Sequence, residues 1–122
     1  MISGIHHAAV IVTELNAATA FYRDVLGLPI NPHRPDLGYE GVWFDVGPQQ
    51  LHLMVLPNPE AAIQRPQHAG RDRHLALSVS ALEDIRIRLE NENIPFTLSR
   101  SGRKALFCRD PDGNGIELVE NV

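Results

Sequence analysis

Hydrophobic and polar positions alternate along several short stretches of the 122-residue chain. Residues 8–12 and 74–79 are apolar runs too short for a helix, and their β-branched members favour buried strands. An apolar stripe at helical spacing follows each run, at 17–26, where Asn16 is the expected N-cap, and at 83–93. Further strands are expected at 42–46, 50–56, 96–99, 104–109 and 116–120.

The two halves of the chain repeat one plan. His7 and His74 are each followed by a Val five places later and by a Leu eight places later. Each half ends in an apolar run with one polar residue at its centre, Leu51-His52-Leu53 in the first and Ile116-Glu117-Leu118 in the second. Such self-similarity indicates a duplicated module, and we expect each copy to fold as βαβββ.

The expected organisation is a first module at residues 1–56, a linker at 57–73 and a second module at 74–122, together forming one structural domain. Phe44 and Phe107 are expected to occupy matching places in the two modules. Because strands outnumber helices, the fold class is α+β: two tandem βαβββ modules form a cupped mixed β-sheet with the helices on its outer face.

Four side chains of metal-ligand type fall at two equivalent places of this repeat: His7, His52, His74 and Glu117. The apolar neighbours of each point to the opposite face of its strand, because strand side chains alternate between faces. All four candidates therefore leave the face that the helices must cover. Three imidazoles and one carboxylate gathered there are typical donors for a divalent metal. Glu117 is either exposed on this face or compensated by a cation, since a buried unpaired carboxylate is costly.

Weaker candidates have simpler explanations. His6 is interpreted as a strand-start residue, and His33 and His68 as solvated loop residues, although either of the two could approach a substrate. The segment 29–41, rich in Pro, His, Arg and Gly, is expected to be a mobile loop near whatever the protein binds. Residues 110–115 imitate the start of a calcium-binding loop, but the twelfth position is not Glu, so a hairpin turn is predicted.

Composition restricts the function further. The 11 basic and 15 acidic residues give a formal net charge of −4, and no basic run is present to bind nucleic acid. No stretch approaches the ~20 apolar residues of a membrane span, and the first residues lack signal-peptide features. Cys108, the single cysteine, is expected to pack as a small apolar residue and favours a reducing compartment. We expect a cytoplasmic protein that acts on a small molecule, without nucleic acid or membrane as partner.

These features together resemble the vicinal oxygen chelate superfamily, also called the glyoxalase, bleomycin-resistance and extradiol-dioxygenase superfamily. The resemblance covers essentially the whole chain and rests on the segments 6–15, 21–28, 74–77 and 110–118. It implies paired βαβββ modules around one divalent metal. Many relatives form dimers, so the resemblance also implies a homodimer, in which the two half-sites of one metal can belong to different chains.

In this family the metal ligands map to His7, His52, His74 and Glu117. The resemblance implies a metal-dependent lyase or isomerase of the glyoxalase type, in which the metal binds two adjacent substrate oxygens and stabilises an enediolate. Glu117 matches the carboxylate that serves as ligand and general base. The glutathione-binding Arg of glyoxalase I is replaced by Ile11, so a glutathione conjugate is not the expected substrate. The donor set favours Zn, Ni, Co, Fe or Mn over Mg.

Three alternatives remain open. An Fe(II) extradiol-type dioxygenase needs only two His and one carboxylate, which His7, His74 and Glu117 supply. A fosfomycin-resistance thiol transferase uses the same triad. A metal-free drug-binding module of the bleomycin-resistance kind belongs to a different class and needs no ligand residues. Binding of a metal, and the part of His52 in that binding, distinguish these readings.

Overall fold

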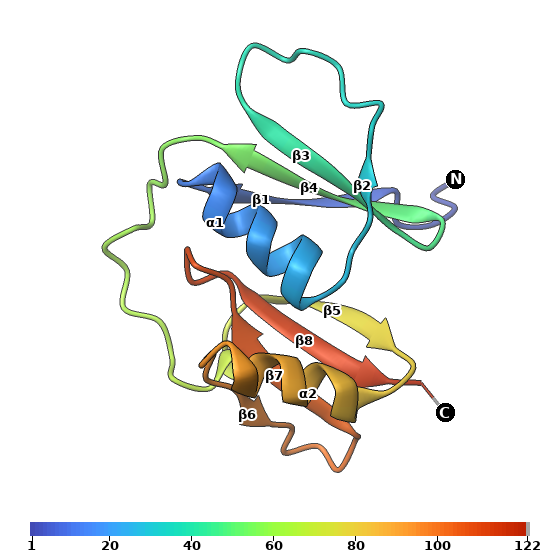
Figure 1. Ribbon diagram of the computed structural model, residues 1–122, viewed down its shortest axis with the longest axis vertical. Helices are drawn as coiled ribbons and strands as arrows, with labels where there is room; N and C mark the ends of the chain where they lie inside the picture. The colour runs from blue at the N-terminus through green and yellow to red at the C-terminus, as the bar shows by residue number, and fades with distance from the viewer. Residues whose placement is uncertain (122) are drawn as a thin grey trace. The chain divides into compact units, whose positions relative to one another are not determined.

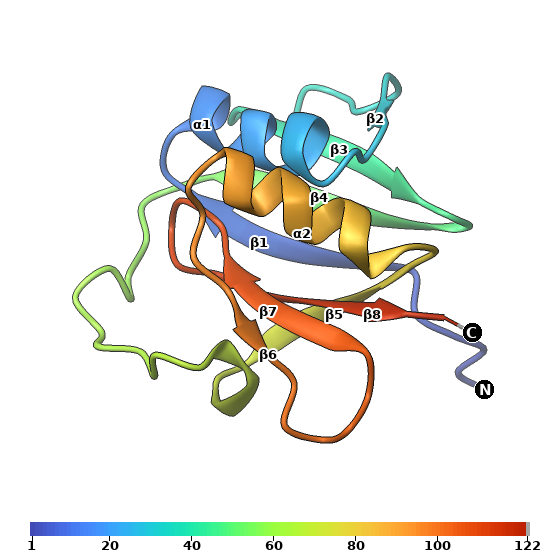
Figure 2. The same ribbon diagram turned by 60° about the horizontal axis from the view of Figure 1, so that its bottom comes forward.

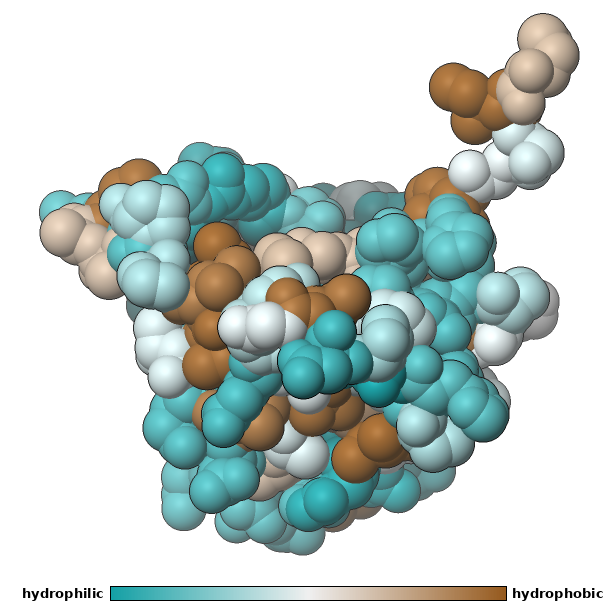
Figure 3. Space-filling view, turned by 90° about the horizontal axis from the view of Figure 1, so that it is seen from above, coloured by the Kyte–Doolittle hydropathy of each residue, from teal (hydrophilic) through white to brown (hydrophobic). Residues whose placement is uncertain are grey.

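The computed structural model describes residues 1–121 and divides into two compact units (Figure 1). Unit 1 is Met1–Ala61, and unit 2 begins at Ala62, inside the segment expected as the linker. The first residues of the chain are exposed and project from the surface (Figure 3). Among the described residues, no helix combines the length and the apolar character required to cross a membrane.

Unit 1 is one four-stranded mixed sheet with a helical segment (Figure 1). Its strands lie in the order β1-β4-β3-β2; β1 is parallel to β4 and the other neighbours are antiparallel. Its elements are β1 (His7–Val12), α1 (Leu15–Thr19), a π-helix (Ala20–Val25), β2 (Ile30–Asn31), β3 (Gly41–Val46) and β4 (Gln49–Val55).

Unit 2 repeats this topology with the order β5-β8-β7-β6 (Figure 2). Its elements are a 3₁₀ turn (Ala69–Arg71), β5 (His74–Val79), α2 (Leu82–Asn91), β6 (Thr97–Leu98), β7 (Ala105–Arg109) and β8 (Gly115–Glu120). The α+β class and the two tandem βαβββ modules predicted from the sequence are confirmed. The turn at 110–115 joins two antiparallel strands and is the hairpin turn expected.

The two helices begin in different ways. Glu14 caps α1, because its carboxylate accepts hydrogen bonds from the backbone N–H groups of Asn16 and Ala17, so the prediction of Asn16 as the cap was wrong. At the start of α2, the carboxylate of Glu120 on β8 accepts the N–H of Leu82 at 2.9 Å. The cap of α1 comes from a residue next to the helix, whereas the cap of α2 comes from a residue distant in the chain. A sequence argument can search for a cap of the first kind only.

The segment 29–41 is less irregular than expected. Ile30 and Asn31 form β2 and pair with β3, and the Asn31 side-chain amide donates to Asp45 at 2.9 Å. Further along, the Arg34 guanidinium donates to the carbonyl oxygen of Tyr39 at 2.9 Å. β2 is the second of the four strands of the first βαβββ module and lies at the edge of its sheet, and the sequence pattern did not locate it.

In β4 and β5 the buried residues follow the predicted alternation, whereas four consecutive residues of β7 and of β8 are buried on both faces. In β4 the buried side chains are those on either side of His52, and in β5 the half-buried and buried positions alternate with exposed ones. Burying a large apolar side chain contributes roughly 1.5–3 kcal/mol, so the alternation fixes which face of each strand is the core face. The most deeply buried side chains include Tyr22, Phe44, Leu51 and Leu53 in unit 1 and Leu89, Leu106, Ile116 and Leu118 in unit 2.

Candidate metal centre

Equal strand register puts the candidate ligands in equivalent positions in the two units. In unit 1, His52 on β4 lies opposite Ala9 on β1, two residues after His7. In unit 2, Glu117 on β8 lies opposite Ala76 on β5, two residues after His74. The two units therefore share not only the sequence repeat but also the register between their parallel strands, β1 with β4 and β5 with β8.

The aromatic neighbour of the site differs from the one expected. Trp43 lies opposite His52, and Phe107 lies opposite Glu117. Phe44, the expected match to Phe107, is fully buried and pairs with Leu51 on the core face. A shift of one residue moves a side chain to the other face of a strand, so the matching of Phe44 with Phe107 was wrong.

The pair in unit 2 is a hydrogen-bonded imidazole and carboxylate. His74 Nδ1 lies 2.8 Å from the carbonyl oxygen of Asp72, and its Nε2 lies 3.1 Å from Oε1 of Glu117. Because a carbonyl oxygen only accepts, we assign the ring proton to Nδ1. In a neutral ring, Nε2 then presents a lone pair to the carboxylate, and the contact requires a proton or a cation between them. A backbone carbonyl behind the ring is also the usual support of a metal-binding histidine.

Glu117 is buried without adequate compensation. Its side chain is 3% exposed, and its other carboxylate oxygen has the Arg103 guanidinium at 3.5 Å. Arg103 is 62% exposed, so solvent screens this ion pair strongly. A buried carboxylate with such weak partners is costly, and a cation bound beside it removes that cost.

The pair in unit 1 is a stack of flat rings. The His7 and His52 rings are 4.1 Å apart with an angle of 17° between their planes, and Trp43 stacks on His52 at 4.3 Å and 8°. His52 Nε2 also lies 2.8 Å from the side-chain oxygen of Gln50. Burial, followed by the positive charge of nearby His7, lowers the pKa of His52 and favours the neutral ring that binds metals. Nearly parallel rings do not aim their nitrogens at one point, so at least one ring must rotate to share an ion.

The structure thus brings the four predicted residues together as two pairs, His7 with His52 and His74 with Glu117. Within residues 1–121, neither unit by itself gathers three or more His, Cys, Asp or Glu side chains suited to hold a metal ion. A centre with all four donors stays a prediction.

His68 has a role that the sequence did not reveal. It is half-buried, its Nδ1 lies 2.6 Å from the Thr97 hydroxyl, and its ring meets the edge of Phe107 with centroids 5.0 Å apart. His68 lies in a loop as expected, but it is half-buried and has partners instead of being fully solvated. His33, by contrast, is exposed as expected. Only the pairing of β6 with β7, which places Thr97 opposite Phe107, gives His68 its partners.

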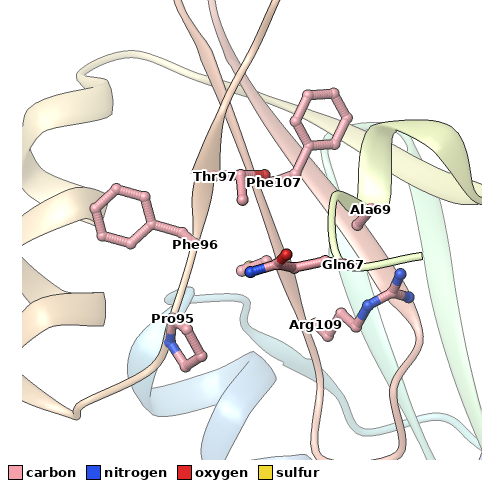
Figure 4. A pocket seen from close by; sticks show the side chains of 8 residues that line it. Gln67, Ala69, Pro95, Phe96, Thr97, Phe107 and Arg109 are labelled. Carbon is pink, nitrogen blue, oxygen red and sulfur yellow. The ribbon is translucent and has the colours of Figure 1, made fainter. Parts of the chain in front are cut away.

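A cavity of about 310 Å³ opens beside this cluster in unit 2 (Figure 4). Cys108 is part of its wall, and burial raises the pKa of this thiol to about 12. The residue is therefore a neutral thiol that packs as a small apolar group, as predicted. The cavity is lined by Gln67, Ala69, Pro95, Phe96, Thr97, Phe107, Cys108 and Arg109.

Known proteins share this fold over the whole chain. YaeR of Escherichia coli K12 is 30% identical over 95% of both chains, and Glyoxylase I 4 of Arabidopsis thaliana is 27% identical over 96% of this chain and 70% of its own. The mitochondrial methylmalonyl-CoA epimerase of mouse is 26% identical over 95% of this chain and 70% of its own. The crystal structure of a glyoxalase family protein from Bacillus anthracis covers 100% of this chain and 98% of its own, with 28% identity and a TM-score of 0.76.

The model of one family matches residues 4–118, which include all four candidate ligands. The resemblance read from the sequence motifs is thereby confirmed at the level of the superfamily. The chain belongs to the Glyoxalase/Bleomycin resistance protein/Dioxygenase superfamily.

Proposed function

We propose that the protein is a divalent-metal-dependent enzyme of the glyoxalase type, a lyase or isomerase that acts on a small substrate with two adjacent oxygens. The observation that carries the proposal is the contact between His74 Nε2 and the buried Glu117 carboxylate, with Nδ1 held by a backbone carbonyl. Relatives named as a glyoxylase and as an epimerase support a lyase or isomerase over an oxygenase.

The residues present fit a divalent metal. His7, His52 and His74 supply imidazole nitrogens and Glu117 supplies a carboxylate, a set that suits Zn, Ni, Co, Fe or Mn. A divalent metal held by these residues would supply Lewis-acid chemistry toward two adjacent oxygens of the substrate. A set of four protein donors favours this chemistry over that of an Fe(II) dioxygenase, for which two His and one carboxylate suffice.

Glu117 is the proposed general base. Its carboxylate removes a proton from the carbon next to the polarised carbonyl and returns it at the neighbouring position or on the other face. His74 keeps its ring orientation through the bond from Nδ1 to the carbonyl oxygen of Asp72.

The metal content of the purified protein tests the proposal most directly. Elemental analysis of protein purified without added metal should find about one divalent ion per chain. His52→Ala should lose most of it, and His33→Ala, which removes an exposed loop imidazole, should not. Full metal retention in His52→Ala would favour the three-donor Fe(II) enzyme instead. Absence of metal from the wild type would favour the metal-free binding module.

Glu117→Gln tests the role of the base separately. The amide keeps the shape and one donor oxygen but cannot accept the proton, so turnover should fall about 10²- to 10⁴-fold while most metal stays bound. The readout is deuterium exchange from D₂O at the carbon α to the carbonyl, followed by NMR on a panel of small 2-hydroxy and 2-oxo carbonyl compounds. Wild-type exchange rates in the variant would rule out Glu117 as base.

The proposed assembly is a homodimer. Mixing chains that carry His7→Ala with chains that carry His74→Ala tests which copies supply the two pairs. If the pairs come from different chains, the mixed dimer regains one intact centre and part of its metal. If both pairs come from one chain, mixing restores nothing.

A further inference from the structure

We infer that a second cavity of unit 2 binds the anionic group, a carboxylate or a phosphate, of the substrate; the inference rests on the proposed function. The cavity has a volume of about 350 Å³ and opens at the edge of the sheet, where β6 meets the segment before β5. It is lined by Pro66, Gln67, His68, Arg71, Thr97 and Arg100.

The two arginines of this cavity have no acidic partner in the part of the chain that the structure describes. Arg71 and Arg100 are exposed, and neither guanidinium forms an ion pair among residues 1–121. The nearby carboxylate of Asp72 is already held by Arg65 at 3.2 Å and by Arg109 at 2.9 Å. Two unneutralised guanidinium groups at one cavity favour an anion, because their planar donors match carboxylate and phosphate oxygens.

The basic residues are distributed unevenly between the units, although unit 2 also carries nine of the 15 acidic residues and is formally neutral. The chain carries a net charge of −4, and of its 11 basic residues all except Arg23 and Arg34 lie in unit 2. At the cavity itself, burial and then the charges of Arg100 and Arg71 lower the pKa of His68. Both arginines therefore contribute positive electrostatic potential at His68, and a bound anion would neutralise part of that potential.

The cavity adjoins the candidate metal centre on one face of the sheet. Thr97, Phe107 and Glu117 are cross-strand partners on β6, β7 and β8, and such partners point to the same face. The Phe107 ring contacts His68 on one side, with centroids 5.0 Å apart, and His74 on another, at 5.1 Å. One aromatic ring therefore separates the arginine cavity from the His74–Glu117 pair, a span that a small substrate covers.

The polar wall of the cavity is held in place by packing. A Cβ added to Gly70 would lie 2.7 Å from His68 Nε2 and 3.1 Å from Phe107, so only glycine lets these two rings approach the turn. His68 in turn fixes the Thr97 hydroxyl through the 2.6 Å contact. A hydroxyl with a fixed orientation beside two arginines adds a directional hydrogen-bonding group for an anion.

The test uses the full-length protein freed of metal with chelator, at constant ionic strength. Inorganic phosphate and acetate are titrated separately while NMR follows the backbone amides of Thr97 and Arg100. Saturable shifts are expected, and Arg71→Gln and Arg100→Gln should each weaken binding roughly tenfold. Arg88→Gln, an equal change of charge on the exposed face of α2, should leave binding unchanged. Tighter binding of phosphate points to a phosphate-bearing substrate, and tighter binding of acetate points to a carboxylate.

Equal weakening in Arg88→Gln, or full binding in both cavity variants, would overturn the inference. The outcome is independent of metal, so a protein that binds metal but no anion contradicts this inference alone. A protein that binds the anion but no metal keeps the anion site and contradicts the proposed enzyme. In the metal-loaded enzyme, the same two variants should raise KM while kcat changes little, since they bind a part of the substrate that does not react.

Discussion

Units 1 and 2 carry their candidate ligands at the same register but hold them in opposite ways. In unit 1 the His52 imidazole lies flat between His7 and Trp43. In unit 2 His74 points edge-on at Glu117, with its tautomer fixed by a backbone carbonyl. Duplication preserved the backbone frame, whereas the side chains diverged into one pair that is preorganised for a cation and one that must rearrange.

The residues opposite His7 and His74 show how the two units differ. Gln50 occupies this position in unit 1 and contacts His52, whereas Gly115 occupies it in unit 2. Gly115 makes room for the chain segment that precedes β5: a Cβ there would lie 3.0 Å from the carbonyl oxygen of Arg73. Unit 1 thus has a polar side chain at this position. Unit 2 has a glycine there, which lets the backbone just before His74 approach closely.

The largest expected contrast is in metal affinity. His74→Ala removes a preorganised donor and should weaken metal binding about a hundredfold or more, since loss even of an outer-shell partner costs 10- to 100-fold. His7→Ala should weaken it only about tenfold, because the ring stack no longer has to be broken completely for His52 to rotate. Competition titration with a chelating indicator measures both constants, and a larger loss in His7→Ala would reverse the comparison.

A second contrast concerns the carboxylate that anchors the loop before β5. Burial alone would raise the pKa of Asp72, but hydrogen bonds from Arg109, the Arg73 N–H and Arg65 outweigh it and leave the pKa lowered. Asp72→Asn should lower the free energy of unfolding by about 2 kcal/mol at pH 7. In unit 1, the Asp45 carboxylate accepts a hydrogen bond from the uncharged Asn31 amide rather than from a guanidinium, so Asp45→Asn should cost less, about 1 kcal/mol.

The effect of Asp72 should depend on pH in a defined direction. A lowered pKa in the folded state means that the ionised carboxylate stabilises the protein above its ordinary pKa of 3.8. This stabilisation is lost as the pH falls from there through the lowered value. Urea unfolding should therefore show a smaller difference between wild type and Asp72→Asn near pH 3 than at pH 7. A difference of equal size at both would mean that the carboxylate charge is not responsible.

The sequence predicted what periodicity controls. The strands, both helices and the outward faces of His7, His52 and His74 follow from alternation and helical spacing, because burial enforces those patterns wherever a strand has one core face. Glu117 also left the core face as predicted, yet it is buried. Periodicity states which face a residue occupies but not what covers that face.

The features that could not be predicted depend on contacts between segments distant in the chain. The Glu120 cap of α2 reaches back 38 residues, and His68 meets Thr97 across 29. The two-residue strand β2 is too short to show any alternation. Trp43, and not Phe44, lies opposite His52 because of the register between β3 and β4. A shift of one residue would exchange the two side chains between faces, and the hydrophobic pattern alone does not determine that register.

A third contrast is steric. Gly115→Ala puts a Cβ 3.0 Å from the Arg73 carbonyl oxygen and 3.1 Å from Cβ of His74, so the backbone before β5 must shift. We expect a loss of about 1–2 kcal/mol in the free energy of unfolding, measured by urea titration, together with weaker metal binding. Gly4→Ala is the matched control, because a Cβ there meets nothing within 4 Å. Equal stability of both variants would mean that the close approach at Gly115 is easily relaxed.

The smallest expected effect tests the unit 1 stack itself. Gln50 Oε1 lies within hydrogen-bond distance of His52 Nε2, so a metal can bind through that nitrogen only if this contact is broken. Gln50→Ala removes this competitor and should therefore tighten metal binding about threefold, in line with the modest net strength of one hydrogen bond. Stability should change little, since the side chain is only half-buried. If metal binding weakens instead, Gln50 supports the ring from behind, and His52 binds through Nδ1. Unit 1 would then be preorganised in the same manner as unit 2, with a side-chain oxygen in place of the backbone carbonyl that holds His74.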